Sequence, residues 1–178
     1  MFILYAIPIG LALGWLAGGR VAALADLRLR WLPLAFGGLL VQVVLFSGPA
    51  VELVGAAGPP LYLASTLAVL AAVVRNVRVP GLALVALGAA ANLAAILANG
   101  GYMPADPAAL ASLGATIGEG YSNSVVRPDP ALAPLIDRFA TPPWLPFGNV
   151  FSVGDVAIGT GIVIAIASGM RRRSGPTA

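Results

Sequence analysis

The sequence predicts an all-α integral membrane protein: a bundle of about five transmembrane helices with a long extracytoplasmic loop that carries two short helices. The first observation is composition, because 59% of the residues are hydrophobic, only 10% are charged and the mean hydropathy is +0.93. Soluble domains carry about 25% charged residues, so the apolar surface of this chain must face lipid. Two further observations are the arginines that separate the apolar stretches and the Pro- and Gly-punctuated stretch 100–150.

The expected spans follow the apolar stretches within a single membrane domain, 1–178. They are 1–19, 31–47, 60–75, 80–99 and 152–170, with 100–150 as the outer loop. Ser47-Gly48-Pro49 should end or kink the second span. Whether Ala50 to Gly58 continues that span stays open.

The first span has no charged residue, and its first basic neighbour, Arg20, follows it. A secretory signal would place a basic residue before the apolar run, so we expect a retained span with its N-terminus outside. Small residues recur on one face of this span and would let another helix approach closely. They are Gly10, Gly14, Gly18 and Gly19.

The next two spans have recognisable ends. Pro33 is acceptable in the first turn of the second span, and Pro60 opens the third, which Arg75 and Arg78 close. Gln42 falls near mid-membrane, where a polar side chain either bonds a neighbouring helix or serves a ligand site. We favour the helix contact.

The fourth span presents one small and polar face. Gly88, Asn92, Ala95 and Asn99 follow one another at helical spacing. Such a face is expected to pack against a helix rather than lipid. Gly100-Gly101 should cap the C-terminal end of the helix.

The outer loop holds two short helix signals, each an Asp followed by Pro. The expected helices are 108–113, after Asp106, and 131–139, after Asp129. Between them, 118–124 reads as a mobile segment. Residues 141–148 read as an extended apolar strip whose aromatic side chains would lie at the outer headgroup layer.

Arginine placement predicts the orientation of the chain. Counting alternate connections, one side receives Arg20, Arg28, Arg30, Arg75, Arg78, Arg171, Arg172 and Arg173, and the other receives Arg127 and Arg138. Basic residues favour the cytoplasmic side. We therefore expect a bacterial plasma-membrane protein with its N-terminus outside, its C-terminus in the cytoplasm and its long loop external.

Asp155 is the only acidic residue within an apolar run, which makes it a candidate proton, cation or ligand site. Ser152-Val153-Gly154-Asp155 also has the spacing of a helix capping box, with Asp in place of the usual Glu. The carboxylate would then lie about 5 Å below the helix start, near the positive end of the helix dipole. The two roles are compatible, and both stay open.

Polar residues at the ends of the fourth and fifth spans should meet at the outer surface. The candidate cluster is Asn92, Asn99, Asn149, Ser152 and Asp155, with Asn92 about two turns deeper than Asn99. One interpretation is that the cluster pins the two ends of the loop to the bundle. The other is a small external pocket with the loop as its roof.

The residue inventory excludes several chemistries. The chain has no Cys, no His and no Lys, which removes thiol nucleophiles, the usual general base, Schiff-base chemistry and the usual zinc and haem ligands. Asp137 or Glu119 could reach Asp155, but the sequence gives no reason to pair them. We expect no catalytic residue, no metal and no cofactor. The net charge of +3 is too small to indicate a nucleic-acid partner.

Several short motifs together resemble a family of small bacterial multi-pass membrane proteins, domain of unknown function 5317. The motifs are Gly18-Gly19-Arg20, Leu27-Arg28-Leu29-Arg30, Asn92 with Asn99-Gly100-Gly101-Tyr102-Met103-Pro104, and Ser152-Val153-Gly154-Asp155-Val156. The resemblance implies an integral membrane protein and supplies no activity.

These observations favour a non-enzymatic membrane component, accessory or structural, whose outer loop contacts a partner. The expected partners are membrane lipid and either another membrane protein or a second copy of the chain. The alternative is a small carrier or a lipid- or quinone-binding protein that uses a polar outer-leaflet pocket around Asn99, Asn149 and Asp155.

Overall fold

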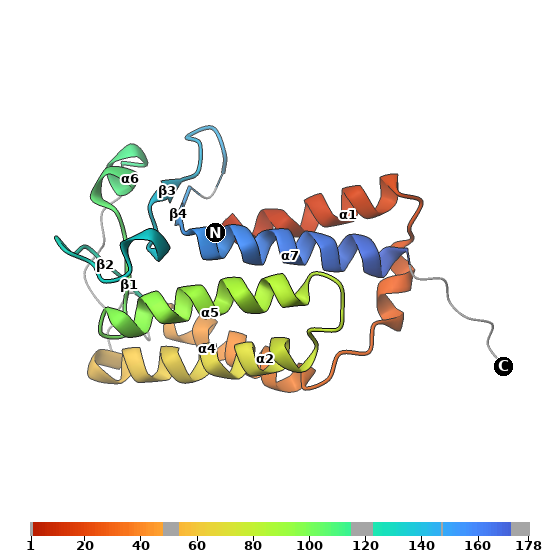
Figure 1. Cartoon of the computed structure of the whole chain (residues 1–178), viewed down its shortest axis with the longest axis horizontal. Coiled ribbons are helices and arrows are strands. Elements are labelled where there is room, and N and C mark those ends of the chain that lie inside the picture. Colours follow the sequence, from red (N-terminus) through yellow and green to blue (C-terminus); the bar gives the residue numbers. More distant parts are fainter. Residues whose placement is uncertain (1, 48–53, 115–122, 147, 172–178) are drawn as a thin grey trace.

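The computed structural model describes residues 2–47, 54–114, 123–146 and 148–171, and it is mostly helical (Figure 1). The long helices are α1 (Ala6–Leu16), α2 (Leu32–Leu45), α4 (Gly58–Arg75), α5 (Leu82–Ala98) and α7 (Val153–Met170). Short 3-10 helices are η1 (Phe2–Tyr5), η2 (Val21–Asp26), η3 (Gly55–Ala57) and η4 (Ala133–Leu135). The remaining elements are α6 (Pro107–Ser112), β1 (Met103–Pro104), β2 (Ser124–Val125), β3 (Phe139–Ala140) and β4 (Val150–Phe151).

The long helices run along one common axis and pack in an order that differs from their order in the chain. Helix α7 contacts α1 on one side and α5 on the other, α5 contacts α4, and α4 contacts α2. The connections 17–31 and 76–81 lie at one end of the bundle with the last turn of α7, and we call this the arginine end (Figure 1). The described residues between 99 and 152 lie at the opposite end, the loop end.

Close helix contacts are made at glycines. A Cβ atom built on Gly161 of α7 would lie 2.6 Å from the carbonyl oxygen of Gly81, and one on Gly38 of α2 would lie 2.8 Å from that of Ser65 on α4. Real Cβ atoms essentially never approach other atoms so closely. The interfaces α5–α7 and α2–α4 therefore depend on the absence of a side chain at these positions.

The expected small face of α1 packs against α7. A Cβ on Gly10 would lie 3.2 Å from the Val163 Cα, and a Cβ on Gly14 would lie 3.2 Å from the Ala167 Cα. The prediction is confirmed for these two glycines, and Gly19 likewise faces Met170. It is wrong for Gly18, whose Cβ would meet nothing within 4 Å. Gly18 instead makes the turn after α1, with φ of +74°.

Large apolar side chains cover much of the outer surface of the bundle. Exposed examples from different helices are Trp15, Leu16, Phe36, Leu40, Val43 and Leu87. In the described part of the chain, Gly55–Arg75 and Val153–Met170 are long and apolar enough to cross a membrane. Shorter apolar helices are Ile3–Leu16, Leu32–Leu45 and Leu82–Ala98.

Helix α2 is fixed to α4 by its one polar side chain. The Gln42 Nε2 donates a hydrogen bond to the Thr66 Oγ1 of α4 at 3.2 Å. The expected helix contact of Gln42 is thus confirmed. Helix α2 ends at Leu45. Of the stretch 50–58, residues 50–53 lie outside the described part of the chain, and the rest contains η3 and the first residue of α4.

Asn76 joins the two connections at the arginine end, a role that was not predicted from the sequence. Its Oδ1 accepts a hydrogen bond from the Arg30 backbone N–H at 2.8 Å, and its Nδ2 donates to the carbonyl oxygens of Arg30 and Ala72, both at 2.7 Å. Asn76 is buried. The segment before α2 and the turn after α4 are therefore held together by one amide group.

We call residues 100–151 the outer segment; its described parts fold over the loop end. Strands β1 and β2 pair in parallel, β3 and β4 pair antiparallel, and Ala105 bridges Asp137. Helix α6 starts at the Asp106 N-cap, whose carboxylate accepts from two backbone N–H groups, and it stops before Gly114 at φ of +61°. The first expected short helix is confirmed.

The second expected short helix, 131–139, is wrong. Only the 3-10 turn η4 forms there, and residues from Ile136 onward are extended. Pro134 lacks the N–H that a helix needs, and Leu132 has a left-handed φ of +52°. The backbone of Asp137 instead bonds to Pro104 and Asp106. The mobile segment expected at 118–124 lies mostly outside the described residues.

A buried apolar cluster fixes the outer segment to the bundle. Ala95 and Ile96 of α5 pack against Met103 of β1, and Tyr62, Leu63 and Leu135 surround them. The Tyr5 hydroxyl donates a hydrogen bond to the Pro146 carbonyl, which connects η1 to the strip 141–146. The outer segment is therefore packed on several helix ends rather than suspended between two of them.

Candidate functional site

The first turn of α7 is closed by a complete capping box. The Ser152 Oγ accepts a hydrogen bond from the Asp155 N–H at 3.0 Å, and the Asp155 Oδ2 accepts one from the Ser152 N–H at 3.1 Å. The sequence prediction of this cap, with Asp in the third helical position, is confirmed. Both ends of the motif are thereby fixed at the loop end of the bundle.

Asn92 connects this cap to α5. Its Nδ2 donates to the Asp155 Oδ1 at 2.8 Å, and its Oδ1 accepts from the Ser152 Oγ at 2.7 Å. Ser152 is completely buried. The close approach of α5 and α7 at Gly88 and Gly154 lets the amide reach both partners, since a Cβ on Gly154 would overlap the Asn92 side chain.

Asn99 holds the outer segment at a separate point. Its Oδ1 accepts from the Ala131 N–H at 2.9 Å and its Nδ2 donates to the Ala131 carbonyl at 2.9 Å, with a second bond to the Ala95 carbonyl at 2.8 Å. Asn99 is buried at the end of α5, where Gly100 and Gly101 adopt left-handed φ values and cap the helix as expected. These bonds join the loop to the bundle.

Asn149 lies in a third set of contacts. Its backbone N–H donates to the Thr141 Oγ1 at 2.9 Å, and its carbonyl accepts from the Thr141 N–H at 3.0 Å. Of the five residues that the sequence grouped, the structure joins Asn92, Ser152 and Asp155 by hydrogen bonds. Asn99 and Asn149 each fix a different part of the outer segment.

Asp137 is the acidic residue that sequence reasoning did not pair with anything. It lies in the outer segment between η4 and β3, its side chain is only 9% exposed, and its Oδ1 has no hydrogen-bond partner within the described protein. Burial, together with the smaller effect of the nearby charge of Asp155, raises the pKa of the Asp137 carboxyl to about 8. The only sequence signal was an acid directly after the apolar run that ends at Ile136.

The donor set limits the chemistry of this region. Its side chains are two carboxyls, two amides and a hydroxyl, from Asp137, Asp155, Asn92, Asn99 and Ser152. No group of three or more His, Cys, Asp or Glu side chains that could hold a metal ion occurs among the described residues. The arrangement can hold the outer segment, and it can bind a proton on a carboxyl.

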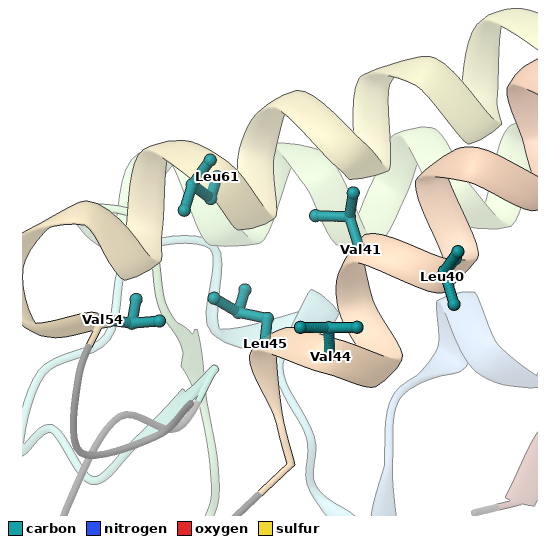
Figure 2. A pocket seen from close by; sticks show the side chains of 6 residues that line it. All are labelled: Leu40, Val41, Val44, Leu45, Val54 and Leu61. Carbon is teal, nitrogen blue, oxygen red and sulfur yellow. The ribbon is translucent and has the colours of Figure 1, made fainter. Parts of the chain in front are cut away.

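A concave feature lies away from this cluster, at α2 and α4. A groove of about 300 Å³ runs between α2 and the start of α4, and Figure 2 shows the aliphatic side chains around it. They are Leu40, Val41, Val44, Leu45, Val54 and Leu61. Among the described residues, the groove offers apolar contact and no polar side chain to orient a ligand.

Comparison with known proteins gives a family and no activity. No curated protein matches the chain significantly, and no solved structure does. The model of a family of unknown function (DUF5317) matches residues 26–167, which include α2, α4, α5, the outer segment and most of α7. The chain therefore belongs to the DUF5317 family, whose function is unknown.

Proposed function

We propose that the chain is a five-span protein of the bacterial plasma membrane, non-enzymatic, and that its outer segment contacts a partner. The N-terminus and the outer segment lie outside, and the arginine end lies in the cytoplasm. The observation that carries this proposal is the separation along the bundle axis of three zones. Arginine-bearing connections lie at one end, a folded polar segment lies at the other, and exposed apolar helix surface lies between them.

Helix length supports a bilayer location. The 18 residues of α7 rise by about 27 Å at 1.5 Å each, close to the hydrocarbon thickness of about 30 Å. Helix α2, with 14 residues, rises by about 21 Å. A short helix is accommodated by local thinning of the bilayer and by interfacial side chains, and Trp31 stands exposed at the start of α2.

A partner-binding role is supported by the outer segment itself. Its described parts expose several apolar side chains, with Trp144 78% exposed and Val126, Leu132 and Phe139 also exposed. Exposed aromatic side chains are the usual anchors of protein interfaces. The hydrogen bonds between Asn99 and Ala131 hold the outer segment on α5, and those between Asn149 and Thr141 join two parts of the segment itself.

Orientation is tested by labelling single cysteines in intact cells with a membrane-impermeant maleimide. The native chain has no Cys, so each label reports one site. We expect Ala111→Cys in α6 to react in intact cells, and the exposed Val77→Cys at the arginine end to react only after permeabilisation. Labelling of Val77→Cys from outside would overturn the orientation.

The partner role is tested by affinity purification in mild detergent. We expect a partner protein or a second copy to co-purify with the wild type, and Trp144→Ala to reduce its yield. Trp15→Ala is the matched control, because Trp15 is similarly exposed, at 72%, but lies on α1 within the apolar zone. A wild-type protein that runs alone as a monomer would count against the proposal.

The second candidate is a small carrier or a lipid- or quinone-binding protein, and the aliphatic groove of Figure 2 favours it. Because the groove lies on helix surface that we place in the bilayer, its occupant would be an acyl or isoprenoid chain. Thermal stabilisation by an added phospholipid or quinone, lost in Leu45→Trp but kept in Leu87→Trp, would support this candidate. Leu87 is an exposed leucine on α5, outside the groove.

A further inference from the structure

The outer segment buries the Asp137 carboxyl within electrostatic reach of the Asp155 carboxyl at the start of α7. Asp155 belongs to the first turn of α7, and both of its oxygens accept hydrogen bonds, from Asn92 and Ser152. Asp137 comes from the segment after η4, which itself packs on α5 and α7. The two carboxyls interact electrostatically, and the Asp137 Oδ1 stays unpartnered within the described protein although the residue is buried.

Elementary electrostatics does not allow this arrangement with two full negative charges. A buried carboxylate without a donor costs several kcal/mol, and a second carboxylate nearby adds repulsion. The two groups are not equivalent, because Asp155 has donors that stabilise its charge and lies at a helix N-terminus. The proton therefore belongs on Asp137, whose Oδ1 has no donor within the described protein.

We propose that Asp137 and Asp155 form a proton-binding site at the joint between the outer segment and α7, and that one proton on Asp137 keeps the segment closed on the helix. Loss of that proton leaves a buried carboxylate on Asp137 that is also repelled by the Asp155 carboxylate. The segment 133–140 then separates from α7 until Asp137 reaches water. The site lies at the loop end, so in the orientation proposed above it responds to the pH outside the cell.

The surrounding groups agree with this assignment. From the helices packed here, Asp155 of α7 and the Tyr62 hydroxyl of α4 interact electrostatically with Asp137. In the segment itself, the Asp106 carboxylate caps α6 and the next residue, Arg138, is exposed. The backbone of Asp137 forms hydrogen bonds with Pro104 and Asp106. A movement of Asp137 would therefore disturb β1 and the start of α6.

Amide hydrogen exchange measures the opening directly. The reporters are the N–H of Asp106, bonded to the Asp137 carbonyl, and the N–H of Asp137, bonded to the Pro104 carbonyl. Release of one proton on opening raises the opening constant up to about tenfold for each pH unit, until Asp137 ionises in the closed state. Protection factors, which remove the intrinsic pH dependence of exchange, should therefore fall between pH 5 and 8. The Arg30 N–H, bonded to Asn76 at the arginine end, should keep a constant protection factor.

Asp137→Asn keeps the shape of the side chain and removes its titration, so we expect protection factors in the outer segment that do not change with pH. Asp155→Asn should weaken the pH dependence by removing the like charge. Should either variant fail to fold, infrared spectroscopy of the wild type supplies the test. A protonated carboxyl band must then be present at pH 6 and disappear as the pH is raised to 9.

Three results would overturn the proposal. The first is wild-type protection in the outer segment that is constant across this pH range, and the second is an Asp137→Asn variant with the wild-type slope. The third is stabilisation by Na⁺ or Ca²⁺ over choline at equal ionic strength, present in the wild type and lost in Asp137→Asn. That result would mean that a metal cation, not a proton, neutralises the pair.

Discussion

The contact between α5 and α7 at Gly154 can be tested by adding one methyl group. In Gly154→Ala the new Cβ would overlap the Asn92 side chain, with 2.7 Å to its Cγ, and would lie 2.8 Å from the Gly88 carbonyl oxygen. A C–H group normally approaches a carbonyl oxygen to about 3.3 Å, so the helices must separate by about 0.5 Å or Asn92 must move away.

The loss of stability expected for Gly154→Ala follows from these two responses. Overpacking a fitted interface costs about 1–3 kcal/mol, and each interhelical hydrogen bond of Asn92 contributes about 0.6 kcal/mol in a membrane protein. Replacing Gly by Ala within a helix stabilises the helix by up to about 1 kcal/mol, which offsets part of this loss. We therefore expect Gly154→Ala to lower the free energy of unfolding by about 2 kcal/mol. Reversible unfolding in mixed micelles with increasing dodecyl sulfate, followed by tryptophan fluorescence, measures it.

Gly37→Ala is the matched control, because a Cβ at this α2 position would meet nothing within 4 Å. We expect it to leave stability unchanged or raise it by up to about 1 kcal/mol. Asn92→Ala removes the side chain that the new Cβ would overlap, so it should remove much of the destabilisation caused by Gly154→Ala. The double variant should therefore be more stable than the sum of the two single effects predicts. A Gly154→Ala protein as stable as the wild type would refute this packing of α5 on α7.

Three other perturbations test separate parts of the fold. Asn76→Ala should cost about 1–3 kcal/mol, because Arg30 loses two hydrogen bonds to a buried amide, and trypsin in detergent should then cut faster at Arg28 and Arg30. Gln42→Leu should cost at most about 1–2 kcal/mol by removing the bond to Thr66, measured in the same micelle assay. For wild-type stability, the raised pKa of Asp137 predicts a contribution that is full below pH 4 and is lost as the pH rises toward 8. Asp137→Asn should remove this decline in a series of thermal unfolding scans, whereas an unchanged decline would assign it to another group.

The positions of the long helices could be predicted because they depend on local signals. Apolar runs, first-turn prolines and terminal glycines each act within a few residues, and so does the Ser152–Asp155 capping box. The small faces of α1 and α5 could be read for the same reason, since helical spacing alone places Gly10 beside Gly14. The helix that packs against each face could not be predicted, because nothing in the residue spacing indicates that both faces pack on α7.

The outer segment was harder to predict because its structure depends on contacts between distant residues. Strands of two residues, such as β1 and β2, carry no periodicity and exist only through their pairing. The expected helix 131–139 was wrong because Pro134 outweighs the helix-forming residues around it. The approach of Asp137 to Asp155 depends on this fold of the outer segment, so the sequence alone offered no reason to pair them.

The place of α7 between α1 and α5 has a consequence for biosynthesis. Helix α1 emerges first from the ribosome, yet the neighbour on which its glycine face packs is synthesised only after all the other long helices. In the membrane arrangement proposed above, α2, α4 and α5 can associate during translation before the glycine face of α1 has its partner helix. Arrival of α7 then closes two interfaces at once, so a chain truncated before residue 153 should leave α1 unattached and become a substrate for membrane proteases.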